Sequence, residues 1–288
     1  MKKLAFIKRS SGSHWVGDGF PVQGIFSYAD IADELSPFLL LDYAGPADFP
    51  PTTRQLGVGQ HPHRGFETVT IVYKGGVSHR DSSGGGGTIG PGDVQWMTAA
   101  SGLIHEEYHS PEYAAKGGAF EMVQLWVNLP AKDKMAPPGY QGITADQIPE
   151  VALPDQAGTA RIIAGHYGDT HGPARSFTPM NVWDLRLKAR HRVALDLPEG
   201  HTTALFVLRG AIRLDGQHTV GAAELAVMAR EGSQLIFDVT DDTTLLLLDG
   251  APLNEPIIGH GPFVMNTREE IAQAINDFNS GHFGQISR

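Results

Sequence analysis

The chain has 288 residues, of which 32 are acidic and 22 are basic, giving a formal net charge of −10. This balance excludes the basic surface that non-specific binding to nucleic acid needs, so no direct nucleic-acid partner is expected. The chain contains no cysteine, which excludes disulfides, zinc–thiolate sites, iron–sulfur clusters and thiol catalysis.

Neither a membrane segment nor a signal peptide is predicted. No apolar run approaches the roughly 18 residues that a membrane-spanning helix needs. Near the start, Lys8 and Arg9 interrupt an apolar run that is too short for a signal-peptide core. We therefore expect a cytoplasmic protein with no membrane partner.

Short strand-like segments follow one another along almost the whole chain. They are rich in Val, Ile, Leu and aromatic residues, and turn-forming residues bound them, in line with the 35 glycines and 19 prolines. These segments lie at residues 38–43, 67–73, 94–98, 120–129, 160–164, 182–187, 204–208, 235–239 and 243–248. Helical periodicity is confined to the end, where Thr267 and Glu270 predict a capping box ahead of apolar residues. The pattern predicts an all-β chain closed by one short C-terminal helix.

Two short clusters carry metal-competent side chains at positions i and i+2: His61-Pro62-His63 and His105-Glu106-Glu107. Alternate residues of a strand point to the same face, so each pair is expected to converge and Glu106 to face away. Three imidazoles and one carboxylate on the inner wall of a β-barrel predict a first-row transition-metal site. The alternative is a set of polar residues on a strand edge, hydrogen-bonded to water. Burying all four without a metal would be costly.

The chain contains a weak internal repeat. Residues 130–154 are rich in Pro, Gly, Lys and Asp, as expected of a surface connection between two units. On either side of it, residues 72–77 are similar to 207–212, and 92–97 to 223–228. We therefore predict two domains, at residues 1–135 and 136–288.

Matching the two halves at Gly75 and Gly210 shows what the second half has in place of the first cluster. The positions matching His61, His63 and His105 are Asp196, Pro198 and about Leu235. The second half thus lacks the cluster, and only the first half is expected to bind metal.

Several motifs resemble those of the pirin family, within the cupin superfamily. They lie at residues 61–70, 90–99 and 102–105, with further matches at 37–42, 124–130 and 263–267, so the similarity covers nearly the whole chain. The resemblance implies a bicupin, with two face-to-face antiparallel β-barrels of jelly-roll type. It also implies one metal in the N-terminal barrel, held by His61, His63, His105 and Glu107, and a degenerate C-terminal barrel. The implied metal is iron, as Fe(II), although Mn, Ni, Cu or Zn would suit similar ligands.

The same resemblance implies two functions. Several pirins oxidise quercetin with dioxygen, and others bind partners in transcription. The first hypothesis is a dioxygenase that opens the ring of a small aromatic, enolic substrate of the flavonol type, with Glu107 taking the proton of the substrate hydroxyl. The alternative is a non-enzymatic, redox-responsive binding protein with a protein partner. A different metal enzyme on the same fold is the third interpretation.

Three other polar residues near these motifs are interpreted more cautiously. Glu67 is expected to orient an imidazole ligand rather than to bind metal itself. His79 precedes a glycine-rich hairpin loop, which favours a surface position. His109 could lie at the rim of a pocket or have no role in a site.

Overall fold

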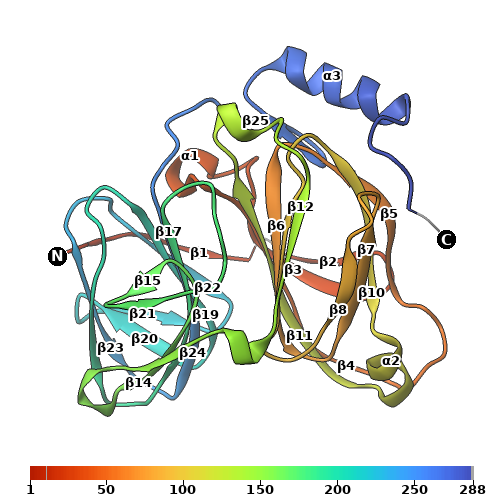
Figure 1. Ribbon diagram of the computed structural model, residues 1–288. Helices are drawn as coiled ribbons and strands as arrows, with labels where there is room; N and C mark the ends of the chain where they lie inside the picture. The colour runs from red at the N-terminus through yellow and green to blue at the C-terminus, as the bar shows by residue number, and fades with distance from the viewer. Residues whose placement is uncertain (11, 287–288) are drawn as a thin grey trace. The chain divides into compact units, whose positions relative to one another are not determined.

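The computed structural model describes residues 1–10 and 12–286 and divides the chain into two compact units (Figure 1). The unit that we call the N-terminal barrel contains Phe38–Ala145 and also takes the segment that begins at Asn254. The unit that we call the C-terminal barrel contains Asp146–Leu253 together with Met1–Ser10 and Glu34–Pro37. The predicted single boundary after residue 135 therefore misses an exchange, in which each terminal segment of the chain joins the barrel remote from it in sequence.

The N-terminal barrel consists of a seven-stranded and a four-stranded antiparallel sheet. In pairing order, the larger sheet contains β12 (Gly139–Ile143), β9 (Val94–Thr98), β6 (Phe66–Lys74), β11 (Gly118–Asn128), β4 (Phe38–Phe49), β3 (Phe20–Phe26) and β2 (Ser13–Val16). The smaller sheet contains β5 (Gly57–His63), β10 (Leu103–His109), β7 (Val77–Asp81) and β8 (Gly86–Ile89). A separate hairpin contains β25 (Ile258–His260) and β26 (Phe263–Met265). The segment predicted as a bare surface connection thus contributes an edge strand, β12, which pairs with β9.

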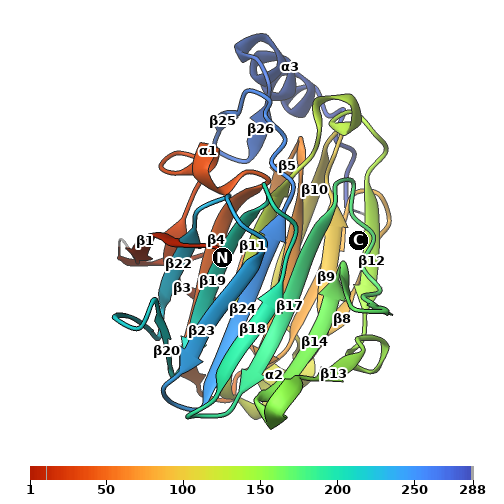
Figure 2. The same cartoon turned by 90° about the vertical axis from the view of Figure 1, so that its left-hand side faces the viewer.

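The C-terminal barrel has the same construction. Its larger sheet contains β1 (Leu4–Arg9), β22 (Glu224–Met228), β19 (Thr202–Arg209), β24 (Thr243–Gly250), β17 (Met180–Leu187), β14 (Gly158–Ala164) and β13 (Glu150–Ala152). Its smaller sheet contains β18 (Arg192–Asp196), β23 (Gln234–Val239), β20 (Ala211–Leu214) and β21 (His218–Gly221), and a short hairpin pairs β15 (His166–Tyr167) with β16 (Thr170–His171). Figure 2 shows β24, β17 and β14 side by side in the larger sheet. The fold is therefore a bicupin, as predicted.

Helical structure is sparse in the described part of the chain. It is limited to the helices α1 (Ala32–Leu35), α2 (Pro111–Lys116) and α3 (Arg268–Asn279) and to the 3₁₀ turns η1 (Ala131–Asp133), η2 (Ala145–Gln147) and η3 (Pro154–Gln156). The predicted capping box starts α3: the Thr267 side chain accepts from the Glu270 backbone N–H, and the Glu270 carboxylate accepts from the Thr267 N–H. None of the described helices is long and apolar enough to cross a membrane.

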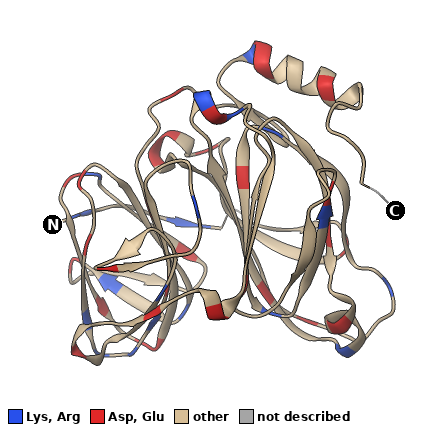
Figure 3. Ribbon diagram, viewed as in Figure 1, with Lys and Arg blue, Asp and Glu red and all other residues tan. Residues whose placement is uncertain are grey.

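Helix α3 belongs to the N-terminal barrel because of what it buries there. Its apolar residues Ile271 and Ala274 lie in one cluster with Phe263 of β26. In addition, Arg64 Nη1 donates to the Asp277 carboxylate at 2.8 Å, with only 5% of the Arg64 side chain exposed. These contacts explain why the end of the chain joins its first barrel. Elsewhere, basic and acidic residues are scattered along the ribbons of both units (Figure 3).

The matching strand order allows the two barrels to be aligned residue by residue. β5–β10–β7–β8 corresponds to β18–β23–β20–β21, and β9–β6–β11–β4 corresponds to β22–β19–β24–β17. His61 lies opposite His105, and the corresponding pair in the second barrel is Leu195 opposite Leu235. The repeat and the Leu235 match agree with the sequence count. The match of His61 to Asp196 was off by one, because Leu195 lies fifteen residues before Gly210, whereas His61 lies fourteen residues before Gly75.

The alignment explains why the second barrel has no comparable cluster. The three positions that match the histidines hold Leu195, Leu197 and Leu235, which all belong to the buried apolar core of the C-terminal barrel. Each has at most 4% of its surface exposed. At these three positions the N-terminal barrel has imidazoles, and the C-terminal barrel has packed leucine side chains.

Candidate metal centre

Three imidazoles meet on the inner face of the four-stranded sheet of the N-terminal barrel. His61 and His63 come from β5, and His105 comes from the neighbouring strand β10, directly opposite His61. Ring centroids lie 4.2 Å apart for His61 and His105, 4.8 Å for His63 and His105, and 4.9 Å for His61 and His63. One nitrogen of each ring lies within 4.8 Å of the others. This is the spacing of side chains that can share one metal ion.

The backbone after His63 is fixed by a turn that only glycine can make. Gly65 has a φ of +92°, and a Cβ there would lie 1.9 Å from the carbonyl oxygen of Val264. The buried ammonium of Lys134 donates to the carbonyl oxygens of both residues, at 2.7 Å to Gly65 and 2.9 Å to Val264. The end of β5 is therefore held against β26, and the position of His63 follows from it.

Burial leaves the three imidazoles neutral and leaves some of their nitrogens without partners. Both ring nitrogens of His105 and Nδ1 of His63 are buried with no hydrogen-bond partner among the described residues. Burial, followed by the neighbouring imidazoles, holds the pKa values of His63 and His105 well below 6.5, and burial also lowers the pKa of His61. A neutral imidazole is the form that binds metal. In a barrel that never bound a metal ion, these unpaired nitrogens would lower the stability of the fold without any compensation.

Glu107, the predicted fourth member of the site, is not brought into the imidazole cluster. It faces the barrel interior, where its carboxylate oxygens are within 3.5 Å of Thr70 Oγ1 and 3.4 Å of Gln124 Nε2. Burial raises the pKa of Glu107 to about 7. The pairing of β10 with β5 shifts register between His105 and Glu107 because β5 carries an extra residue there, while β10 stays in regular register with β7. The structure thus groups three of the four predicted ligands and leaves the carboxyl beside them.

The two other glutamates near the motifs lie on outer faces. Glu106 forms an ion pair with Arg80 on the adjacent strand β7, as expected for a residue that faces away from the site. Glu67 lies on the face of β6 opposite to Thr70, since the two are three residues apart on one strand. There it accepts a hydrogen bond from Thr98 Oγ1 at 2.7 Å, and burial raises its pKa to about 7. The prediction that Glu67 orients an imidazole is therefore wrong.

His79 was assigned to the surface, but it points into the barrel. It lies opposite Glu107 in the pairing of β7 with β10 and is 5% exposed. Its Nε2 is 2.5 Å from the hydroxyl of Tyr140, which reaches it from β12. Burial lowers the pKa of His79 to about 4. The alternation of Val77, His79 and Asp81 along β7 was the signal that could have revealed this.

His109, by contrast, belongs to the aromatic core. Its ring stacks on Phe120 at 4.9 Å, and its Nε2 is 2.9 Å from the carbonyl oxygen of Gly19. His109 also lines a cavity of about 360 Å³ together with Tyr108 and Pro111, so both the core and the pocket-rim interpretations have support. A more instructive aromatic pair lies next to His63: Phe66 stacks on Trp126 at 4.2 Å, and the Trp126 ring is 5.3 Å from the His63 ring. Flat apolar surface therefore adjoins the imidazoles.

Comparison with known proteins agrees with this geometry. A family model for Pirin matches residues 19–127, and one for the Pirin C-terminal cupin domain matches residues 182–284. A Pseudomonas aeruginosa protein provisionally named quercetin 2,3-dioxygenase is 59% identical over 98% of this chain and 99% of its own length. Human pirin is 37% identical over 87% of this chain and 83% of its own length. The crystal structure of quercetin 2,3-dioxygenase from Acinetobacter baumannii superimposes with a TM-score of 0.97 and 56% identity, covering 100% of both chains.

Proposed function

The chain belongs to the pirin family, and from this premise we propose that it is a non-haem, metal-dependent dioxygenase. Its substrate would be a flavonol-type, quercetin-like molecule whose ring is opened with dioxygen. The observation that carries the proposal is the cluster of three imidazoles, of which the buried His63 and His105 have ring nitrogens without partners. The names of the two quercetin 2,3-dioxygenase relatives support the choice of reaction and substrate.

His61, His63 and His105 would hold one divalent transition metal. Imidazole suits Fe, Ni, Cu and Zn, so the ligand type alone does not select among them, and Fe(II) is our choice for a reaction with dioxygen. When bound, the metal would supply Lewis-acid and redox chemistry at this position. The chain itself supplies neutral ligands that need not lose a proton before binding.

Glu107 is the fourth residue of the proposed site, as a ligand or as the catalytic base. Two observations support the role of a base: its carboxyl lies apart from the imidazole cluster, and burial raises its pKa to about 7. A base with a pKa near the working pH is efficient, because it is partly ionised and still basic. Its carboxylate would take the proton from the substrate hydroxyl, while the partly exposed ring of Trp126, backed by the buried Phe66, would offer a flat surface to an aromatic substrate.

The proposal is tested by measuring oxygen uptake and flavonol loss with protein loaded anaerobically with Fe(II). We expect turnover in the wild-type protein, a loss of roughly 10²-fold or more in Glu107→Gln, and no metal retention in His63→Ala. Glu106→Gln is the matched control, because it alters the neighbouring glutamate on the outer face of the same strand and should leave turnover unchanged.

Two results would contradict the proposal in different ways. Full metal stoichiometry in His63→Ala would refute the ligand assignment. Stoichiometric metal in the wild-type protein without turnover of several enolic substrates would refute the dioxygenase. That second result would instead favour a redox-responsive binding protein, the function suggested for some pirins.

A further inference from the structure

The C-terminal barrel has a cavity lined by both apolar and polar groups at the end that corresponds to the imidazole cluster. The β6–β11 and β19–β24 pairs carry a register shift at the same place, which fixes their alignment. In this alignment His201 matches Phe66 and Asp249 matches Trp126. The aromatic stack beside the first site is thus replaced in the second barrel by a hydrogen bond, from His201 Nδ1 to Asp249 Oδ1 at 2.9 Å.

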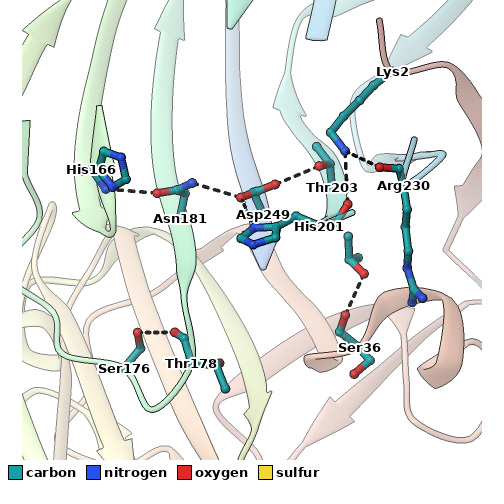
Figure 4. Close-up of polar contacts among 11 residues, drawn as sticks. Lys2, Ser36, His166, Ser176, Thr178, Asn181, His201, Thr203, Arg230 and Asp249 are labelled. Atoms are coloured by element: carbon teal, nitrogen blue, oxygen red, sulfur yellow. Dashed lines mark hydrogen bonds and ion pairs between the residues drawn. The ribbon is translucent and has the colours of Figure 1, made fainter. Parts of the chain in front are cut away.

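This hydrogen bond is part of a continuous network (Figure 4). The Asp249 carboxylate, 0% exposed, also accepts from Thr203 Oγ1 at 3.0 Å and from Asn181 Nδ2 at 3.0 Å. The other end of the Asn181 amide accepts from the backbone N–H of His166 at 3.0 Å, which fixes the orientation of that amide. The network therefore ties the β15–β16 hairpin to His201 through the side chains of Asn181 and Asp249.

The network leaves one nitrogen of His201 unused. Because Nδ1 donates its proton to a carboxylate, the neutral ring carries its lone pair on Nε2. No described residue forms a hydrogen bond with this Nε2, and the side chain remains 15% exposed. Behind the ring, Lys2 Nζ donates to the backbone carbonyl of His201 at 3.2 Å and so holds its position. His201 presents a fixed hydrogen-bond acceptor.

That acceptor borders a cavity of about 310 Å³. This volume is near the lower end of the range for small-molecule sites. The rings of His166 and His171, 5.7 Å apart, line it together with the apolar side chains of Met180 and Pro198. The walls of the cavity are imidazole faces and apolar side chains, and Nε2 of His201 is its directed acceptor. Such a site suits a flat apolar molecule with one hydroxyl group.

A metal ion is a poorer fit for this cavity. Among the described residues, the ligand atoms that converge as a group of three belong to His61, His63 and His105. The three imidazoles here are instead spread around the space, as expected for walls rather than for ligands of one ion.

We propose that this cavity is a second binding site, for a small phenol whose hydroxyl donates to Nε2 of His201. The site is separate from the proposed metal centre and does not depend on its activity.

The test is a titration of metal-free, ¹⁵N-labelled full-length protein with 4-methylphenol, followed by NMR. We expect shifts of the amides of His166 and Asn181, and binding about tenfold weaker for toluene, which has the same shape without the hydroxyl. His201→Asn keeps a donor for Asp249 but lacks Nε2, and it should weaken 4-methylphenol by a similar factor. His218→Asn, an exposed histidine of β21, is the matched control and should bind like the wild type.

Pro198→Trp provides a second variant that leaves the network intact. It fills the cavity from an exposed position and should abolish binding. The proposal is overturned if toluene binds as tightly as 4-methylphenol, if His201→Asn or Pro198→Trp binds like the wild type, or if the shifts lie in the N-terminal barrel.

Discussion

The comparison of the two barrels predicts that His105→Leu stabilises the metal-free protein. The corresponding position of the second barrel holds Leu235, which is fully buried in the apolar core. His105 is equally buried, but both of its ring nitrogens lack partners. Leucine is of similar size and has no polar atoms to satisfy, so the substitution removes a penalty without leaving a large cavity.

The size of the effect follows from those two nitrogens. Each unsatisfied buried group costs about 1–3 kcal/mol, and imperfect repacking takes back about 1 kcal/mol. We therefore expect the free energy of unfolding of metal-free His105→Leu to exceed that of the wild type by about 1–5 kcal/mol. Metal removes or reverses this difference, because a ligand at 1,000 times its Kd stabilises the wild type by about 4 kcal/mol. The variant retains only two of the three imidazoles, so metal should raise its free energy of unfolding only slightly.

Urea unfolding in chelator and in excess Ni²⁺ or Zn²⁺, neither of which needs anaerobic handling, measures both free energies. Leu235→His is the reciprocal control: it buries a lone imidazole in hydrocarbon and should destabilise the protein by about 2 kcal/mol with or without metal. The reasoning is refuted if His105→Leu is less stable than the wild type in chelator, or if metal stabilises it as strongly as the wild type.

Three further predictions follow from other buried groups. Turnover of the wild-type enzyme should rise as pH increases through about 7, where the Glu107 carboxyl ionises, and a pH profile of kcat/KM without this rise would exclude Glu107 as the base. Because the pKa of Glu67 is about 7 in the fold and near its usual 4.5 when unfolded, its contribution to stability is complete below about pH 4.5 and is lost as pH rises through 7. Glu67→Gln should therefore flatten the pH dependence of urea unfolding between these values. Lys134→Met leaves three buried acceptors without their donor, and we expect a loss of about 2–4 kcal/mol, measured by the same unfolding.

The architecture was predictable because its signals are local and repeated. Strand-like segments bounded by turn residues, the capping box of α3 and the internal repeat all appear in the structure. The exchange of the terminal segments was not predictable, because it depends on long-range contacts. Nothing near Leu4–Arg9 shows that it pairs with Glu224–Met228, and nothing near Asp277 shows that it meets Arg64.

In the candidate site, strand alternation predicted the convergence of His61, His63 and His105 and the outward turn of Glu106. It also predicted that Glu107 faces the interior, but periodicity cannot show whether the carboxyl reaches the imidazoles, because that depends on contacts with Thr70 and Gln124 from the opposite sheet. His79 was missed for a different reason. Its partner Tyr140 comes from a segment whose composition suggested a connection rather than a strand.

The position of Glu107 two residues after His105 in β10 also bears on how one strand can serve two purposes. A carboxylate bound to a metal must be ionised, whereas the burial of Glu107 holds its pKa at about 7. Thr70 and Gln124, from the opposite sheet of the barrel, donate to this carboxylate and favour its ionised form, whereas burial favours the protonated form and outweighs them. The second barrel lacks both halves of this arrangement, since leucines take the place of the imidazoles and the polar groups at its end belong to the larger sheet. The same frame can thus support metal chemistry in one copy and hydrogen-bonded recognition in the other, and the residues on a few strands decide which.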